Sequence, residues 1–326
     1  MLNKWGLKKT QSIIHVEKLT KRYRKTEKAA VNNISFDVQP GEFFAFLGPN
    51  GAGKTTTISI LTTTLAKTSG NITIAGYDVS TQAKNVRENV GIIFQNPSLD
   101  LNLSAEENIR LHVNLYGVYS YKPFFRLMPK EYQNQVLEMA GFMGIREDLF
   151  KPLKTFSGGM KRKLEIIRGL MAKPKVLFLD EPSQGLDAVS RRDLWIYLRN
   201  VAKNQNTTIF LTTHYIEEAE NADRVCIVNH GQIIFLGTPS EMKNRLLGKY
   251  LVLDAENRNM LHSQIANFKS ETTVDGKAKI YFEEQTPQKI LAQIKMPLTC
   301  MELHTPTLEE AYMDLIENKT SEATVQ

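Results

Sequence analysis

The chain has 326 residues and a formal net charge of +6, and with 42% hydrophobic and 23% charged residues it has the composition of a folded protein, which excludes a largely disordered chain. A chain of this length is longer than one hydrophobic core usually accommodates, so we expect one large domain and a smaller one. No apolar run approaches the roughly 18 residues of a membrane-spanning helix, and the first residues lack the apolar segment of a secretory signal, so neither a membrane span nor secretion is expected.

The positive charge is concentrated at the start of the chain. Residues 1–28 carry nine Lys and Arg against Glu17 and Glu27. Two interpretations remain open: a solvated face, or a patch for nucleic acid or anionic lipid. The solvated face is favoured because no aromatic or arginine-rich periodicity accompanies the charge.

The segment LGPNGAGKTTT, residues 47–57, carries the first recognisable motif. It follows an apolar run of strand character, GEFFAFLG, and precedes Ile58, Leu61 and Leu65, which recur at helical spacing. Strand, glycine-rich loop and helix are the setting that the pattern G-x-x-x-x-G-K-[ST] requires. We therefore expect a phosphate-binding loop that begins at Gly48 and ends at Thr55.

The residue types of this loop suit a nucleoside triphosphate with Mg²⁺. Gly51 and Gly53 allow successive N–H groups to point inward and cradle phosphate together with the helix N-terminus. Lys54 is expected to reach the β- and γ-phosphates, and the Thr55 hydroxyl to bind Mg²⁺. A glycine-rich turn without function is the alternative. The residues expected to bind nucleotide here are Gly48, Pro49, Asn50, Gly51, Ala52, Gly53, Lys54, Thr55 and Thr56.

Helical patterns fill much of the segment between residues 95 and 157. SAEENIRLHVNLYG combines a capping Ser104 and Glu107 with Ile109 and Leu115 on the following helix, and YQNQVLEMAGFMG continues the helical character.

The segment TFSGGMKRKLEIIRGLMA indicates a second anion site. Ser157 is a suitable N-cap, Gly158 and Gly159 expose backbone N–H groups, and apolar residues from Met160 onward recur on one helical face. Because one γ-phosphate needs only one such cradle per side, this site is expected to serve a nucleotide held by another copy. Taken alone, the pattern is also compatible with a simple capped loop.

The segment KVLFLDEPSQGLD is a buried strand that ends in two acids. Asp180 is expected to hold Mg²⁺, and Glu181, free of the metal, to orient or deprotonate the attacking water. A solvated turn is the alternative. The pair points to hydrolysis of ATP rather than transfer of its phosphate.

After about residue 240 the composition changes. YLVLDAEN, AKIYFEE and CMELH predict strands, and TPQKILAQIK and TLEEAYMDLIEN predict helices, which together indicate a small α+β appendage without catalytic residues. The only cysteines, Cys226 and Cys300, are expected to be reduced, buried thiols, since they form neither a disulfide framework nor a zinc spacing.

The phosphate loop, FSGGM and FLDEP, in this order and spacing, resemble the ATP-binding cassette family, whose ATPase subunits drive transporters. The resemblance covers residues 14–240. It implies an α/β P-loop ATPase cassette with a helical subdomain at about 96–170, flanked by an N-terminal extension, 1–13, and a C-terminal accessory domain, 241–326. It also implies that ATP and Mg²⁺ are sandwiched between Lys54 and Thr55 of one cassette and residues 157–159 of a second, identical or different cassette.

Further roles follow from the same resemblance. Tyr23 resembles the aromatic residue that stacks on adenine, although a partly buried strand tyrosine is the alternative. Gln95 resembles the glutamine that senses Mg²⁺, and His214 the switch histidine at the γ-phosphate, although a lone histidine is usually structural. Asp187 matches the loop through which two cassettes communicate.

Two departures leave the central motif intact: Met160 stands where the family most often has glutamine, and Phe156 where it most often has leucine. SGGM followed by basic residues resembles the branch that serves drug, antibiotic and lipid exporters with separate permeases. The resemblance thus implies a permease docked on the helical subdomain at the cytoplasmic face of the cell membrane, and no nucleic-acid partner.

The rival hypothesis is a soluble cassette protein that acts on ribosomes or nucleic acid. The basic N-terminus alone supports it, because the chain has neither a second cassette nor a long coiled-coil insertion. A GTPase is disfavoured because no N-K-x-D motif for guanine is present.

Overall fold

The computed structural model describes residues 12–24, 26, 28–94, 98–246, 249–282, 287–304, 307–313 and 315–316. The chain divides into two compact units, Met1–Leu236 and Gly237–Gln326. Within the described ranges, no helix combines the length and the apolar character that a membrane crossing requires.

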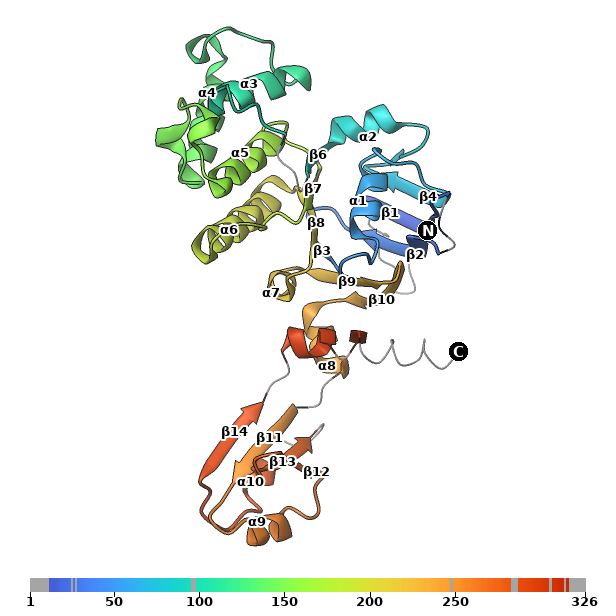
Figure 1. Cartoon of the computed structure of the whole chain (residues 1–326), viewed down its shortest axis with the longest axis vertical. Helices are drawn as coiled ribbons and strands as arrows, with labels where there is room; N and C mark the ends of the chain where they lie inside the picture. Colours follow the sequence, from blue (N-terminus) through green and yellow to red (C-terminus); the bar gives the residue numbers. More distant parts are fainter. Residues whose placement is uncertain are drawn as a thin grey trace, which may run out of the picture. The chain divides into compact units, whose positions relative to one another are not determined.

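The first unit contains two sheets (Figure 1). One has the order β2-β1-β4-β5 and is antiparallel, with β1 at Ile14–Lys21, β2 at Val31–Val38, β4 at Ser69–Ile74 and β5 at Tyr77–Asp78. The other has the order β10-β9-β3-β8-β7-β6, with β3 at Phe43–Leu47, β6 at Val90–Ile93, β7 at Val176–Asp180, β8 at Thr208–Thr213, β9 at Arg224–Asn229 and β10 at Gln232–Gly237. The pairs from β9 to β6 are parallel, so the chain leaves β3, β7 and β8 at the same edge.

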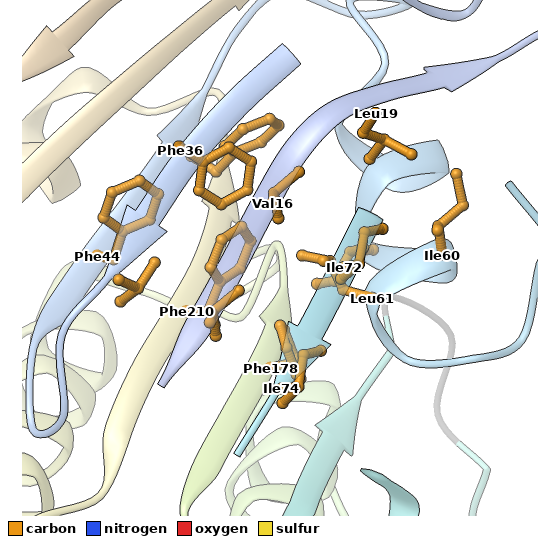
Figure 2. Close-up of a cluster of buried hydrophobic side chains, with 14 of the residues drawn as sticks. Val16, Leu19, Phe36, Phe44, Ile60, Leu61, Ile72, Ile74, Phe178 and Phe210 are labelled. Atoms are coloured by element: carbon orange, nitrogen blue, oxygen red, sulfur yellow. The ribbon is translucent and has the colours of Figure 1, made fainter. Parts of the chain in front are cut away.

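A core of aromatic and aliphatic side chains fills the space between these sheets (Figure 2). Phe36 of the antiparallel sheet stacks on Phe44 with ring centroids 5.6 Å apart, and Phe210 lies 5.4 Å from Phe44. All residues of β3, β7 and β8 are buried, which explains the continuous apolar sequence of β3 and of β7 up to Asp180. Cys226 is buried in this core, and burial raises the pKa of its thiol.

Helices α1, α2, α5, α6 and α7 contact the six-stranded sheet, whereas α3 and α4 form a group with α5 away from it (Figure 1). Their bounds are α1 Lys54–Leu61, α2 Ala83–Asn89, α3 Ala105–Leu115, α4 Lys130–Phe142, α5 Gly158–Leu170, α6 Ala188–Gln205 and α7 Ile216–Ala219. Short 3₁₀ turns occupy Phe125–Leu127, Arg146–Asp148 and Leu153–Thr155.

One expectation about these helices needs correction. Helix α1 ends at Leu61, so Leu65 lies beyond it, half-buried against the core. The prediction that Ile109 and Leu115 share a helix is confirmed by α3, in which Ile109 is buried and Leu115, the last residue, is 82% exposed. The predicted start of α3 is confirmed, because Ser104 and Glu107 form a complete capping box.

The second unit contains helix α8, Pro239–Leu246, and an antiparallel sheet in the order β12-β13-β11-β14. Its strands are β11 Lys249–Asp254, β12 Ser270–Thr272, β13 Ala278–Phe282 and β14 Cys300–His304, and its other helices include α9 Arg258–Gln264 and α10 Pro287–Leu291. The sequence predicted β11, β13 and β14 and missed α8, α9 and β12. Cys300 is only partly buried, which corrects the expectation of a buried thiol.

Candidate functional site

The loop between β3 and α1 holds Lys54 in a defined position. The Lys54 Nζ donates to the carbonyl of Gly48 at 2.7 Å and to that of Pro49 at 3.2 Å. Burial lowers the pKa of Lys54, while the nearby carboxylates of Glu181 and Asp180 oppose this change. The ammonium group is therefore held where the loop, the helix and two acids meet.

The glycines of this loop meet specific steric demands. Gly53 precedes α1 with φ at 104°, and a Cβ there would lie 2.4 Å from the carbonyl oxygen of Ala30. Gly51 also has a positive φ, 80°. Only glycine adopts such conformations freely, so these two positions need the residue that the motif places there.

Asp180 and Glu181, at the end of β7, have different surroundings. Asp180 is buried and accepts a hydrogen bond from the Thr212 hydroxyl; burial raises the pKa of the Asp180 carboxyl, and this hydrogen bond opposes the rise. Glu181 has φ at 48°, an unusual conformation for this residue type, and its N–H donates to the carbonyl of Thr212 at 3.1 Å. One acid is thus fixed beneath the surface and the next is turned outward.

His214 directly follows β8, the neighbour of β7. Its Nδ1 lies 3.1 Å from Oε1 of Glu181, within hydrogen-bond distance. Adjacent parallel strands that end at the same edge bring these two residues together across 33 positions of sequence.

These elements surround a polar cleft with a volume of about 500 Å³, which we call the nucleotide cleft. Its lining residues are Ala30, Asn50, Gly51, Gly53, Lys54, Thr55, Thr56, Glu181, Gln184 and His214. Six of the nine predicted loop residues and the two acid–base candidates, Glu181 and His214, therefore share one cavity. Ala52 is not among them, because its side chain packs in the core.

The remaining predicted residues lie outside this lining. Tyr23 follows β1 and is 42% exposed, with its hydroxyl 3.4 Å from that of Thr56, so it is not the partly buried strand tyrosine considered as an alternative. Gln95 lies outside the described residues. Asp187 caps α6 by accepting from the N–H of Ser190 at 2.9 Å.

Ser157, Gly158 and Gly159 begin α5. The Ser157 hydroxyl accepts from the N–H of Met160 at 3.2 Å, and a Cβ on Gly158 would meet no atom within 4 Å. The N-cap prediction is confirmed. None of the three residues lines the nucleotide cleft.

Sequence reasoning missed Arg162, which braces the site from beneath. This side chain is 5% exposed and donates to the carbonyls of Asp180 at 2.8 Å, Pro182 at 3.0 Å and Phe94 at 2.6 Å. It also pairs with Glu165 at 3.1 Å. The signal was an Arg and a Glu three residues apart, since a charged pair on a helix that packs inward requires partners.

Among the described residues, no cluster of three or more His, Cys, Asp or Glu could hold a metal. Thr55 and Asp180 nevertheless supply hard oxygen atoms of the kind that Mg²⁺ accepts, and Mg²⁺ in phosphate sites usually takes only one or two protein carboxylates. These residues fit an ion whose other ligands come from phosphate and water.

Comparison with known proteins agrees with this geometry. A family model described as ABC transporter matches residues 31–184. The linearmycin resistance ATP-binding protein LnrL of Bacillus subtilis (strain 168) is 31% identical over 93% of this chain and 98% of its own length. The chain belongs to the ATP-binding cassette family. The daunorubicin/doxorubicin resistance ATP-binding protein DrrA of Streptomyces peucetius is 36% identical over 75% of this chain and 72% of its own length.

Solved structures support the same family and fold. The ATP-binding subunit of an ABC transporter matches with a TM-score of 0.62 and 27% identity over 72% of this chain and 93% of that chain. A dimeric cassette bound to ADP and Pi in a post-hydrolysis state shares the fold, with a TM-score of 0.61. It is 22% identical over 69% of this chain and 98% of that chain. The predicted α/β P-loop ATPase fold is confirmed, and this ATP-binding cassette protein is an ATP-hydrolysing enzyme.

Proposed function

We propose that this ATP-binding cassette protein powers an exporter whose membrane-spanning part is a separate permease, and that the compound exported is a drug, an antibiotic or a lipid-like molecule. The observation that carries the proposal is the nucleotide cleft, in which Lys54, Thr55, Glu181 and His214 face one cavity. The similarity to LnrL and DrrA, both named for resistance to antibiotics, supports the class of compound.

In this proposal the loop from Gly48 to Thr56 binds the phosphates of ATP. The Lys54 ammonium exchanges its contacts with the Gly48 and Pro49 carbonyls for the β- and γ-phosphates. Tyr23 stacks on adenine at the edge of the same loop. Its exposed ring and the proximity of its hydroxyl to Thr56 support this role.

Mg²⁺ would be held by the Thr55 hydroxyl, by Asp180 and by Gln95. When bound, the ion would neutralise charge on the phosphates. The hydrogen bond from Thr212 orients the Asp180 carboxylate beneath the loop, and Arg162 fixes the backbone that carries it.

Hydrolysis requires a base for the attacking water, and we assign this role to Glu181. Its carboxylate lines the cleft and is not needed as a metal ligand. His214 holds that carboxylate through its contact at 3.1 Å and contacts the γ-phosphate. A carboxylate that is oriented in this way can accept a proton from water as oxygen attacks phosphorus.

A second cassette completes the site in our proposal. Ser157, Gly158 and Gly159 lie outside the nucleotide cleft of their own chain, and the open space around Gly158 leaves backbone N–H groups accessible to the γ-phosphate of a partner's ATP. Asp187, at the start of α6, is assigned to the contact between the two cassettes.

The permease is proposed to dock on the region around α3 and α4. Half of the twenty exposed large hydrophobic side chains in the described part of the chain fall between residues 101 and 150. Leu115, at 82% exposure, is the most exposed of these ten. Exposed apolar side chains at this density are typical of a protein interface, here with a permease at the cytoplasmic face of the cell membrane.

The test is to isolate tagged protein from gently solubilised native membranes and to identify the proteins that co-purify. A multi-span membrane protein that is lost in Leu115→Glu and kept in Ile196→Glu, an exposed control on α6 outside this region, would support the proposal. Recovery of ribosomal proteins alone would contradict it and favour a soluble cassette protein.

A further inference from the structure

The segment that joins α3 to α4, residues 116–129, is rich in aromatic side chains, and we call it the α3–α4 loop. Five of its residues are Tyr or Phe, whereas aromatic residues make up 9% of the whole chain. Phe124 is 68% exposed and Leu127 is 57% exposed. These two residues lie on one turn, since the N–H of Leu127 donates to the carbonyl of Phe124 at 3.0 Å. Neighbouring large apolar side chains at this exposure indicate a surface that another molecule covers.

The exposed apolar surface continues onto the turn that follows α4. The ring of Phe125 lies 5.3 Å from the ring of Phe150, which is 59% exposed. On its other side, Phe125 lies 6.1 Å from the ring of the buried Tyr132. Phe125 therefore anchors the α3–α4 loop to the helical group, while Phe124 and Phe150 remain open to solvent.

A buried ion pair holds the backbone of the α3–α4 loop. Arg110 is 4% exposed and donates to the carbonyls of Lys122 at 2.7 Å and Pro123 at 3.0 Å. It also pairs with the buried Glu106 at 3.0 Å, and Glu106 accepts from the Tyr132 hydroxyl at 2.9 Å. A buried charged pair is costly, and here its further donors fix an exposed loop. A loop that is fixed beforehand loses less conformational entropy when it contacts a partner.

The charge of the α3–α4 loop has one sign. Residues 108–130 contain no Asp or Glu. Lys122 and Arg126 are exposed, and the part of the chain that the structure describes shows no ion pair for either of them. Glu131, the next acid along the chain, already pairs with Lys173 at 2.8 Å. The loop therefore presents positive charge that no described neighbour neutralises.

The turn that carries Phe150 does not offset this charge. In residues 146–151, Arg146 and Lys151 balance Glu147 and Asp148, and Lys151 pairs with Asp148 at 2.6 Å. The partner that matches the whole surface is therefore anionic.

The residue types favour a lipid surface over a protein partner. Lysine is depleted in protein interfaces relative to the rest of the surface. Exposed aromatic rings beside unopposed Lys and Arg are instead typical of segments at the boundary between membrane and water. There the rings enter the headgroup region, and the basic groups meet anionic lipids.

We propose that the α3–α4 loop and Phe150 rest on an anionic lipid surface. Phe124, Leu127 and Phe150 enter the boundary between headgroups and acyl chains. Lys122 and Arg126 contact the lipid phosphates.

The first experiment measures binding of the purified full-length chain to sucrose-loaded vesicles by sedimentation. One set of vesicles contains phosphatidylcholine alone, and in the other about one third of the lipid is phosphatidylglycerol. Saturating ADP keeps lipid phosphate out of the phosphate loop. We expect at least about tenfold stronger binding to the anionic vesicles, with a decrease as salt is added.

Two pairs of variants locate the contact. Phe124→Ser is expected to weaken binding about tenfold or more, because a ring no longer enters the lipid. Phe142→Ser is its control, since Phe142 is an exposed phenylalanine at the other end of α4.

The second pair removes charge. Lys122→Gln combined with Arg126→Gln is expected to weaken binding about tenfold or more, because two basic groups no longer meet the anionic surface. Arg192→Gln combined with Lys203→Gln removes two exposed basic groups from α6 and should bind as the parent does.

Insertion is measured with Phe124→Trp in a Trp5→Phe background, in which the other indole, that of Trp195, is buried. The fluorescence of the new indole should shift to shorter wavelength with anionic vesicles and be quenched by brominated acyl chains. If the new indole is not quenched, or if both loop variants bind as the parent does, the proposal is wrong. Equal binding of all variants would place the contact elsewhere, for example on the basic residues 1–28.

The vesicles contain no protein, whereas the permease test rests on Leu115 of α3, so the two proposals fail separately. If the parent does not bind vesicles and Phe124→Ser loses a membrane protein in co-purification, the α3–α4 loop belongs to the permease contact and the lipid proposal is wrong.

Discussion

The ammonium group of Lys54 is buried beside two acids and two backbone carbonyls. Burial disfavours its charge, whereas Glu181 and Asp180 favour it, and the Gly48 and Pro49 carbonyls accept its hydrogen bonds. Such an arrangement holds a positive charge in place for an incoming phosphate. Lys54 is the only lysine or arginine in the described lining of the nucleotide cleft.

We therefore expect Lys54→Ala to lower ATP hydrolysis by about 10²-fold or more, because the phosphate charge loses its closest cation. Lys67→Ala is the matched control, since Lys67 also donates to a backbone carbonyl, that of Gly70, at 2.6 Å and does not line the cleft. The measurement is phosphate release at saturating ATP, together with nucleotide binding. Turnover at the control rate in Lys54→Ala would refute the assignment of the loop.

Glu181→Gln tests the proposed base. The amide keeps the shape of the side chain but cannot accept the proton of water, so hydrolysis is expected to fall by about 10²–10⁴-fold while ATP still binds. The variant should then accumulate as an ATP-bound dimer in size-exclusion chromatography with light scattering. Glu88→Gln on α2 is the surface control. A Glu181→Gln protein that binds ATP and stays monomeric would contradict the two-cassette site.

At the residue scale, the sequence predicted those residues of the nucleotide cleft whose position is determined by a local motif. Lys54 and Thr55 follow from the loop pattern, and Glu181 from the acidic end of a buried strand. Arg162 was missed because its partners are carbonyls of residues up to 68 positions away.

At the scale of elements, prediction succeeded where burial on both faces or capping leaves a clear pattern. The buried strands β3 and β7 have apolar runs in the sequence, and the capping box marked the start of α3. It failed at the end of α1, which stops at Leu61 and leaves Leu65 outside the helix. At this end the hydroxyls of Thr62 and Thr64 donate to the carbonyls of Ile58 and Ser59, and Thr63 has φ at 62°, which apolar spacing does not predict.

Helix α3 also carries a titratable group that faces its neighbour. Burial lowers the pKa of His112 from 6.5 to about 4, and the charge of Arg168 on α5 acts in the same direction. The imidazole is thus neutral in the folded protein at neutral pH and lies against the Tyr116 ring, with centroids 4.4 Å apart.

The sign of the resulting pH dependence follows from proton binding. Between pH 6.5 and about 4 the unfolded chain binds a proton at His112 that the folded chain does not, so the free energy of unfolding falls as the pH falls through this range. The contribution lost is up to roughly 3 kcal/mol. In urea denaturation, His112→Gln should lose less stability than the parent between pH 7 and pH 4.5, and equal losses would contradict the prediction.

At the scale of the whole molecule, the two units have separate hydrophobic clusters. The cluster of the first unit joins both of its sheets and α1, and that of the second joins β11, β13, α9 and α10. None of the residues described beyond Gly237 is a buried polar or charged side chain, in contrast with Lys54, Asp180 and Arg162 of the first unit. Composition alone indicated a change of domain near residue 240. It did not predict the order of the strands, because that order depends on pairing between distant segments.

This contrast leads to a prediction for the second unit. A site that selects a compound needs placed polar groups in a pocket, whereas a unit that only stabilises the assembly needs apolar packing surface. The buried side chains of the second unit are apolar, and Met301 and Leu303 on β14 are exposed, at 59% and 57%. We therefore expect a chain that stops after Gly237 to keep its nucleotide site and to lose a contribution to assembly with the permease.

The test compares the truncated and full-length chains in two ways. ATPase activity of the purified proteins should be similar, because the nucleotide cleft is built entirely from residues before the stop. Export of, or resistance to, several compounds in cells with the intact permease should decline by a similar factor for each compound, because fewer complexes assemble. Loss of one compound with retention of the others would assign substrate selection to the second unit, and loss of ATPase activity would show that the first unit needs the second to form its site.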